Sequence, residues 1–65
     1  MSKEAAKQFI NENRMKAREA EGQMLVERTA GNVEGSQHFR SEGLKHHALA
    51  NGAEAVLALW DAAQP

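Results

Sequence analysis

The chain contains a single proline, Pro65, at its last position, and the absence of any interior proline is the feature that most limits its fold. Proline removes a backbone donor and breaks a helix, so every other position is free to be helical. Residues of high helix propensity, such as alanine, glutamate, lysine and leucine, fill the chain, whereas β-branched residues are few and show no strand-like alternation. The sequence therefore predicts an all-α protein.

Local signals indicate where two helices begin and end. Ser2 is a suitable N-cap for a helix that runs to about residue 30. Gly31 suits the left-handed position that commonly follows a helix, and Asn32 is a suitable N-cap for the next helix. We therefore expect residues 1–65 to form one helical domain, an antiparallel two-helix hairpin with a tight turn.

Glycines in the second half leave two arrangements open. The pair Asn51-Gly52 would stop one helix and start another, which would give three helices over about 3–30, 33–50 and 53–63. Alternatively, one helix runs from about 33 to 63, with glycines where the backbone of another helix comes close. We favour the two-helix hairpin.

A chain of 65 residues buries only about 60% of the surface that its unfolded form exposes, so its own core is marginal. No cysteine is present to supply a disulfide. The apolar stripe of the first helix is narrow and small-sided, whereas apolar residues cover well over half of the second helix. The second helix thus has more apolar surface than the first helix can cover. This excess of apolar surface, centred on Leu57 and Trp60, predicts a two-fold dimer that forms a four-helix assembly. The expected core and dimer seam consist of Phe9, Ile10, Met24, Phe39, Leu44, Leu49, Val56, Leu57, Leu59 and Trp60.

Polar residues on the expected helices leave further alternatives open. Glu34, His38, Glu42 and His46 follow one another at four-residue intervals, a spacing that lets carboxylates and imidazoles share a metal. A solvated row with salt-bridge-like pairs is the favoured interpretation, so no metal and no cofactor are expected. His46 lies close to the expected apolar arc, and histidine titrates near neutrality, so a pH-sensitive dimer is a further alternative. Asn13, within the narrow stripe, is either partly exposed or a buried amide that sets register or oligomeric state.

Basic residues on the outer face of the first helix form the expected partner-binding surface. Lys3, Lys7, Arg14 and Arg18 line up opposite the apolar stripe, and a row of glutamates lies beside them. This basic ridge is either a solvated face or a surface that contacts nucleic-acid phosphates or an acidic protein. A protein partner would also contact Met15, Leu25 and Val26.

The chain shows no glycine-rich phosphate loop, nucleophile elbow or cysteine, so we expect no enzymatic activity. A net charge of −1 argues against a general polyanion binder, and no apolar run has the length of a signal or membrane segment, so a cytoplasmic location is expected. The favoured function is that of a small regulatory interaction protein that homodimerises and binds another macromolecule, preferably a protein. The alternative is a nucleic-acid-binding regulator of a phage or plasmid type that uses the basic ridge on the first helix. The expected shape is similar to that of small plasmid and phage hairpins of the RNA-binding repressor-of-primer type, a likeness of shape without a shared motif.

Overall fold

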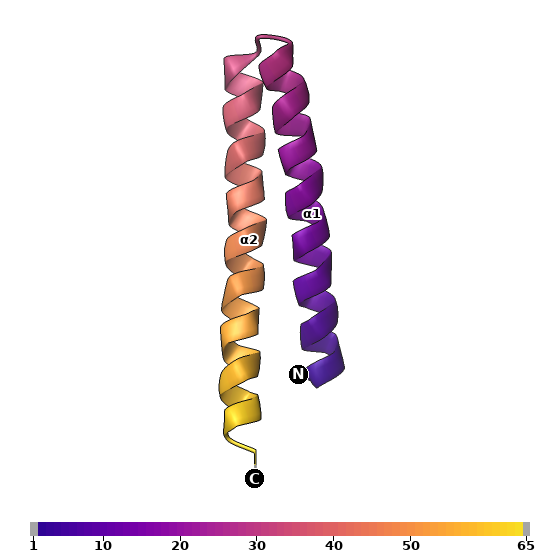
Figure 1. The fold of residues 1–65 in the computed structure, drawn as a ribbon, viewed down its shortest axis with the longest axis vertical. Helices are drawn as coiled ribbons and strands as arrows, with labels where there is room; N and C mark the ends of the chain where they lie inside the picture. The colour runs from indigo at the N-terminus through magenta and orange to yellow at the C-terminus, as the bar shows by residue number, and fades with distance from the viewer. Residues whose placement is uncertain (1, 65) are drawn as a thin grey trace.

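The structure, a computed structural model, describes residues 2–64 and consists of two antiparallel helices (Figure 1). Helix α1 spans Lys3–Thr29 and helix α2 spans Val33–Ala62, with no strand in the described part of the chain. The hairpin measures 54 × 15 × 13 Å, so it is a rod with a length several times its width. The predicted all-α hairpin is confirmed.

The turn follows from its local sequence. Gly31 has φ of 80°, the left-handed conformation that glycine adopts without steric cost. The amide of Asn32 donates to the carbonyl of Glu27 at 2.8 Å, and the amide of Gly31 donates to that of Arg28 at 3.1 Å. These two bonds form a Schellman motif, which satisfies the last carbonyls of α1. The Asn32 side chain then accepts from the Gly35 amide at 3.0 Å and caps α2, as predicted.

Helix α2 continues through Asn51 and Gly52 to Ala62, so the alternative of a break at this pair is wrong. The glycines of α2 differ in their surroundings. A Cβ on Gly43 would lie 3.6 Å from the carbonyl oxygen of Ala17, so the backbones of the two helices approach closely there. A Cβ on Gly52 would have no neighbour within 4 Å, so that glycine marks no close approach.

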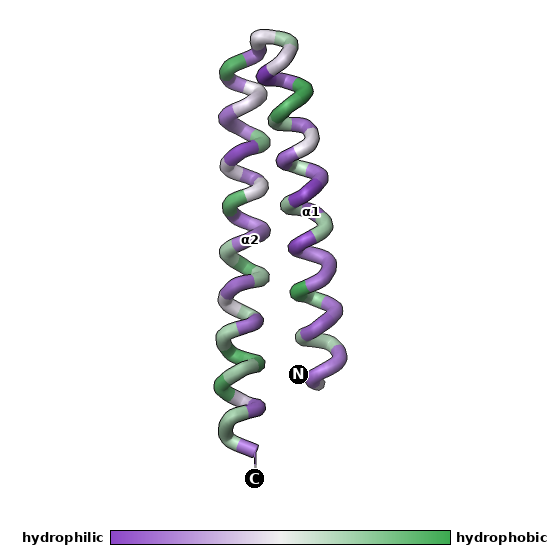
Figure 2. Tube along the Cα trace, viewed as in Figure 1, coloured by the Kyte–Doolittle hydropathy of each residue, from purple (hydrophilic) through white to green (hydrophobic). Residues whose placement is uncertain are grey.

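The contact between the helices is built from small residues. Ile10 is the only large apolar side chain that is buried in the described part of the chain, and the rest of the apolar core is Ala17, Ala20 and Ala50. Figure 2 shows that hydrophobic residues concentrate toward the C-terminal end of α2, while α1 is mostly hydrophilic. Two helices meet along one line only, so this small core leaves most of the apolar surface of α2 uncovered.

The predicted core and seam residues therefore separate into two groups within one chain. Ile10 is buried, and Met24, Phe39 and Leu57 are half-buried. The others are exposed, because the line of contact runs through Gly43 and Ala50 rather than through the larger side chains. The exposed members are Phe9, Leu44, Leu49, Val56, Leu59 and Trp60. Their place at a dimer seam stays a prediction.

Candidate interaction surface

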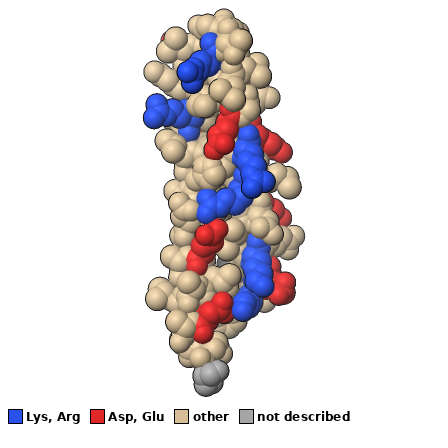
Figure 3. Space-filling view, viewed as in Figure 1, with Lys and Arg blue, Asp and Glu red and all other residues tan. Residues whose placement is uncertain are grey.

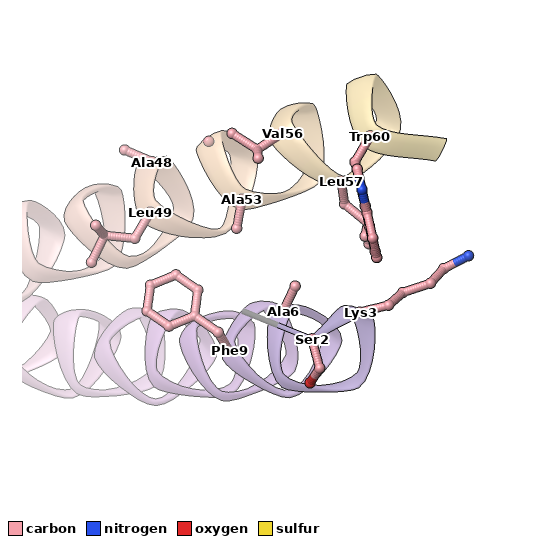
Figure 4. Close-up of a pocket in the computed structure, with 11 residues that line it drawn as sticks. Ser2, Lys3, Ala6, Phe9, Ala48, Leu49, Ala53, Val56, Leu57 and Trp60 are labelled. Atoms are coloured by element: carbon pink, nitrogen blue, oxygen red, sulfur yellow. The ribbon is translucent and has the colours of Figure 1, made fainter. Parts of the chain in front are cut away.

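An apolar groove of about 530 Å³ lies between the helices near their free ends. Figure 4 shows the ring of Phe9 rising from α1, with Leu49, Leu57 and Trp60 extending from α2 toward α1. Its remaining lining residues are mostly small or aliphatic: Ser2, Lys3, Ala6, Ala48, Gly52, Ala53 and Val56. We call this feature the apolar groove. The helices diverge toward this end (Figure 1), so the side chains that line the groove do not close over it.

Large apolar side chains at the groove remain in contact with solvent. Trp60 is 46% exposed, Phe9 38% and Val56 66%. Isolated apolar residues on a surface are ordinary, but a continuous apolar surface of this kind marks an interaction site in many proteins. The apolar groove is therefore the candidate interaction surface of this chain.

The same face becomes polar toward the turn. On α1, Lys16 lies two helical turns after Phe9, so both side chains point to the same side of that helix. On α2, Glu42 lies two turns before Leu49, so these two also share one side. Lys16 and Glu42 line a second, polar groove together with Glu19, Ala20, Gln23, His38, Phe39 and His46. The face is thus divided into an apolar half at the free ends and a polar half near the turn.

The other edge of the hairpin carries a polar network centred on Arg14. Its guanidinium bonds to Asn51 Oδ1 at 2.6 Å, to Glu54 Oε1 at 2.9 Å and to His47 Nδ1 at 2.9 Å. His47 Nε2 lies 2.7 Å from Glu21 Oε1. Arginine only donates, so Nδ1 of His47 accepts and its proton resides on Nε2, which donates to Glu21. Both ring nitrogens of His47 are occupied, and the network joins three positions of α2 to two of α1.

A second cross-helix bond is less exposed. Asn13 is buried, with 6% of its surface exposed. Its Nδ2 donates to the Phe9 carbonyl at 2.9 Å, so its Oδ1 faces His46 Nδ1, 2.8 Å away, and accepts from it. Of the two alternatives for Asn13, the buried amide is therefore the one that the structure shows. His46 and His47 point about 100° apart and reach α1 on opposite sides of the contact line.

The basic ridge is only partly as predicted. Arg14 does not lie on the outer face of α1: it sits beside the contact line, and its long side chain reaches across to α2. Lys3 pairs with Asp61 of α2 at 3.0 Å. Lys7 and Arg18 are exposed. Figure 3 shows acidic side chains interleaved with basic ones along one face of the rod. The role of all four residues in partner binding stays a prediction.

The row of alternating glutamates and histidines does not come together as a metal site in the described part of the chain. His46 Nε2 lies 3.8 Å from Glu42 Oε2, and no group of three or more potential metal ligands is found among residues 2–64. His38 instead packs edge-on against the adjacent Phe39, with ring centroids 5.1 Å apart. His46 is engaged by Asn13 at its other nitrogen.

Comparison of this chain with models of known protein families, with curated proteins and with solved structures finds no match. The class that the geometry itself defines is that of a two-helix hairpin with an apolar groove near its free ends. Neither of its described helices combines the length and the apolar character needed to cross a membrane.

Proposed function

We propose that this protein is a small, non-enzymatic interaction protein that forms a homodimer through the apolar groove and binds another macromolecule. The observation that carries the proposal is the imbalance between buried and exposed apolar residues. Ile10 is the only large apolar side chain buried among the described residues, whereas ten large ones are exposed. A chain of this size with so small a core needs a partner to hold its fold.

The exposed area supports a second copy as that partner. The chain exposes 4877 Å² of solvent-accessible surface. A compact monomer of 7.1 kDa would expose about 4100 Å². The difference of about 800 Å² is similar to the area that each partner contributes to a protein interface of standard size. Burial of that much surface of each chain against a second copy, with the apolar groove as part of it, would bring the exposed surface of each chain close to that of a compact protein.

The polar groups support a structural rather than a catalytic function. A general base needs a ring nitrogen or carboxylate that can take a proton from a substrate. Arg14 and Glu21 occupy both nitrogens of His47, and Arg14 is itself held by Glu54. These groups hold the two helices in register. Their arrangement fits a protein that works by binding, and a cytoplasmic location is part of the same proposal.

A protein is the favoured partner over a nucleic acid. Lys3 and Arg14 are paired with Asp61 and Glu54, so two of the four cations of the ridge already have carboxylate partners. Phosphate binding draws on free cations, and few remain. On α1, the apolar residues Met15, Leu25 and Val26 are all more than half exposed. They give the outer side of α1 an apolar contact surface that a protein would recognise.

Sedimentation equilibrium at micromolar chain concentration tests the dimer. The expected mass is twice the 7.1 kDa of the chain. A variant with Val56→Glu introduces a charge into the apolar groove and should sediment as a monomer or unfold, whereas Met15→Glu, an exposed position outside the groove, should remain dimeric. A folded wild-type monomer at these concentrations would overturn the proposal.

Salt dependence tests the class of partner. Labelled single- and double-stranded oligonucleotides of mixed sequence are titrated with the protein, and binding is followed by fluorescence anisotropy. Binding that weakens steeply with salt, and that is lost in a Lys7→Gln, Arg18→Gln variant, would favour the nucleic-acid alternative. Absence of binding at low salt, where electrostatic attraction is strongest, favours a protein partner.

A further inference from the structure

The residues that line the apolar groove from α2 include four whose spacing is the same in both directions along the chain. Leu49, Ala53, Val56 and Trp60 line the groove from α2. Their successive spacings are four, three and four residues, which is the spacing of the apolar seam of a coiled coil. When such a segment pairs with an antiparallel copy of itself, Leu49 faces the second copy's Trp60, and Ala53 faces the second copy's Val56. Every large side chain of the seam then meets an apolar one.

The other helix has a matching feature at the same level of the rod. Arg14 contacts Asn51 and Glu54, and Lys3 contacts Asp61, so Phe9 on α1 lies level with the middle of this segment of α2. An axis that relates the two α2 segments would thus place Phe9 next to the second copy's Phe9. Two aromatic rings in offset or edge-to-face contact are a favourable pair.

We infer that the occupant of the apolar groove is the same groove of a second copy, turned end for end about a two-fold axis at the level of Phe9 and of the interval between Ala53 and Val56. This inference rests on the proposed homodimer and specifies how its chains pair. The free ends of the two hairpins overlap, and the two turns point in opposite directions. The four helices lie together only in the overlapping part.

Full-length overlap is less favourable in either direction. In an antiparallel arrangement with the axis at the middle of the hairpin, the apolar half of each face would lie against the polar half of the other. Lys16 would also approach the second copy's Lys16, a repulsive pair. In a parallel arrangement, the polar grooves would meet and bury Lys16, Glu19 and Glu42, with a desolvation cost that ion pairs do not reliably offset. Overlap of the free ends leaves these charges in water.

The distance between the two turns distinguishes these arrangements. About 20 residues of helix separate the proposed axis from the turn, which corresponds to about 30 Å at 1.5 Å per residue. The turns of the two copies should therefore lie about 60 Å apart. Antiparallel overlap over the full length would place them about 45 Å apart. Parallel overlap would bring them within about 25 Å, because packed helix axes lie about 8–10 Å apart.

A spin label at Thr29 measures this distance in the full-length protein. The chain has no cysteine, so Thr29→Cys provides one exposed attachment site at the turn, outside the groove. The mass of the labelled protein is measured first, and the distance between labels is then measured by pulsed electron paramagnetic resonance. A dimer with a distance near 60 Å supports the inference. A dimer with a distance near 45 Å, or below about 30 Å, overturns it and leaves the proposed homodimer standing, whereas a monomer overturns both.

Disulfide formation between chains provides a second test. An Ala53→Cys chain and a Val56→Cys chain are mixed and oxidised mildly, because the proposed axis brings these two positions together. The mixed disulfide should form faster than a disulfide between two Lys16→Cys chains, whose cysteines would lie far from the axis. Preferential cross-linking of Lys16→Cys would overturn the inference even if both proteins are dimers.

Discussion

The buried pair of Asn13 and His46 gives the sharpest test of how the hairpin is held in register. Replacing Asn13 by alanine removes the acceptor of the 2.8 Å bond from His46 Nδ1. The His46 side chain is only 17% exposed, so water replaces that acceptor poorly. Loss of one partner of such a bond costs about 1–2 kcal/mol. The Phe9 carbonyl belongs to the α1 backbone, so loss of its bond from Asn13 Nδ2 adds little.

The substitution also has a stabilising component, which must be subtracted. Alanine is the better helix former by about 0.6 kcal/mol. Asn13→Ala should therefore lower the free energy of unfolding by about 0.5–1.5 kcal/mol in total. Asn11→Ala is the matched control, because Asn11 lies on the same helix and is exposed. The control should raise the free energy of unfolding by about 0.5 kcal/mol, since it gains helix propensity only.

A double-mutant cycle isolates the interaction itself. The free energies of unfolding of the wild type, Asn13→Ala, His46→Ala and the double variant are measured by urea denaturation with far-ultraviolet circular dichroism. All four are compared at one chain concentration, because the stability of a dimer depends on concentration. The coupling energy should be about 1 kcal/mol. If the two substitutions are additive within about 0.3 kcal/mol, the bond does not contribute to the stability of the hairpin.

Three further predictions concern glycine, the Arg14 network and the groove. Gly22→Ala should stabilise the protein by about 0.5–1 kcal/mol, because a Cβ there meets nothing within 4 Å. Gly35→Ala should be less favourable, because its Cβ would lie 2.6 Å from Asn32 Nδ2 in the cap; thermal melts of both variants check this. Arg14→Ala should destabilise the protein by about 0.5–1.5 kcal/mol, because it removes three cross-helix bonds. The loss should be smaller at high salt, because salt screens the ion pair with Glu54; urea titrations at two salt concentrations measure it. Trp60→Ala should lower the free energy of unfolding by more than about 2 kcal/mol and weaken the dimer, because the proposed assembly buries Trp60, which is 46% exposed in a single chain. A decrease well below about 1 kcal/mol, with an unchanged mass in solution, would contradict burial of Trp60 in a dimer.

The fold was predictable because its signals are local. Ser2 accepts from the Ala5 amide at 3.1 Å, and Gly31 and Asn32 adopt the cap conformations that their residue types favour. Each of these interactions spans only a few residues, so it can be recognised without knowledge of the tertiary structure. The break expected at Asn51-Gly52 as an alternative failed for the converse reason. Asn51 faces α1 and bonds to Arg14, a contact 37 residues away in sequence.

The polar network was not predicted, because its geometry depends on side-chain reach. Arg14 lies just outside the buried stripe of α1, and steps of 100° per residue record only the direction of its Cβ. A long side chain in that position extends across the line of contact when hydrogen-bond acceptors lie on the other helix. Asn51 and Glu54 of α2 are such acceptors for Arg14. The three-residue spacing of Asn51 and Glu54, next to a histidine on the same side of α2, was the signal that could have indicated a cross-helix acceptor site.

The narrow contact between the helices and the excess of exposed apolar surface have one cause. Ala17, Ala20 and Ala50 are small, and a Cβ on Gly43 would lie 3.6 Å from the carbonyl oxygen of Ala17, so the helix backbones come close together along this part of the contact. Phe9, Leu49 and Trp60 lie beyond this part of the contact, where the helices diverge, so a single chain leaves them exposed around the apolar groove (Figure 1). A hairpin whose helices pack through alanine and glycine thus places its large apolar residues where a second molecule can cover them. Under the proposed assembly, the small residues that make the hairpin thin also leave its large apolar side chains for a second copy to cover.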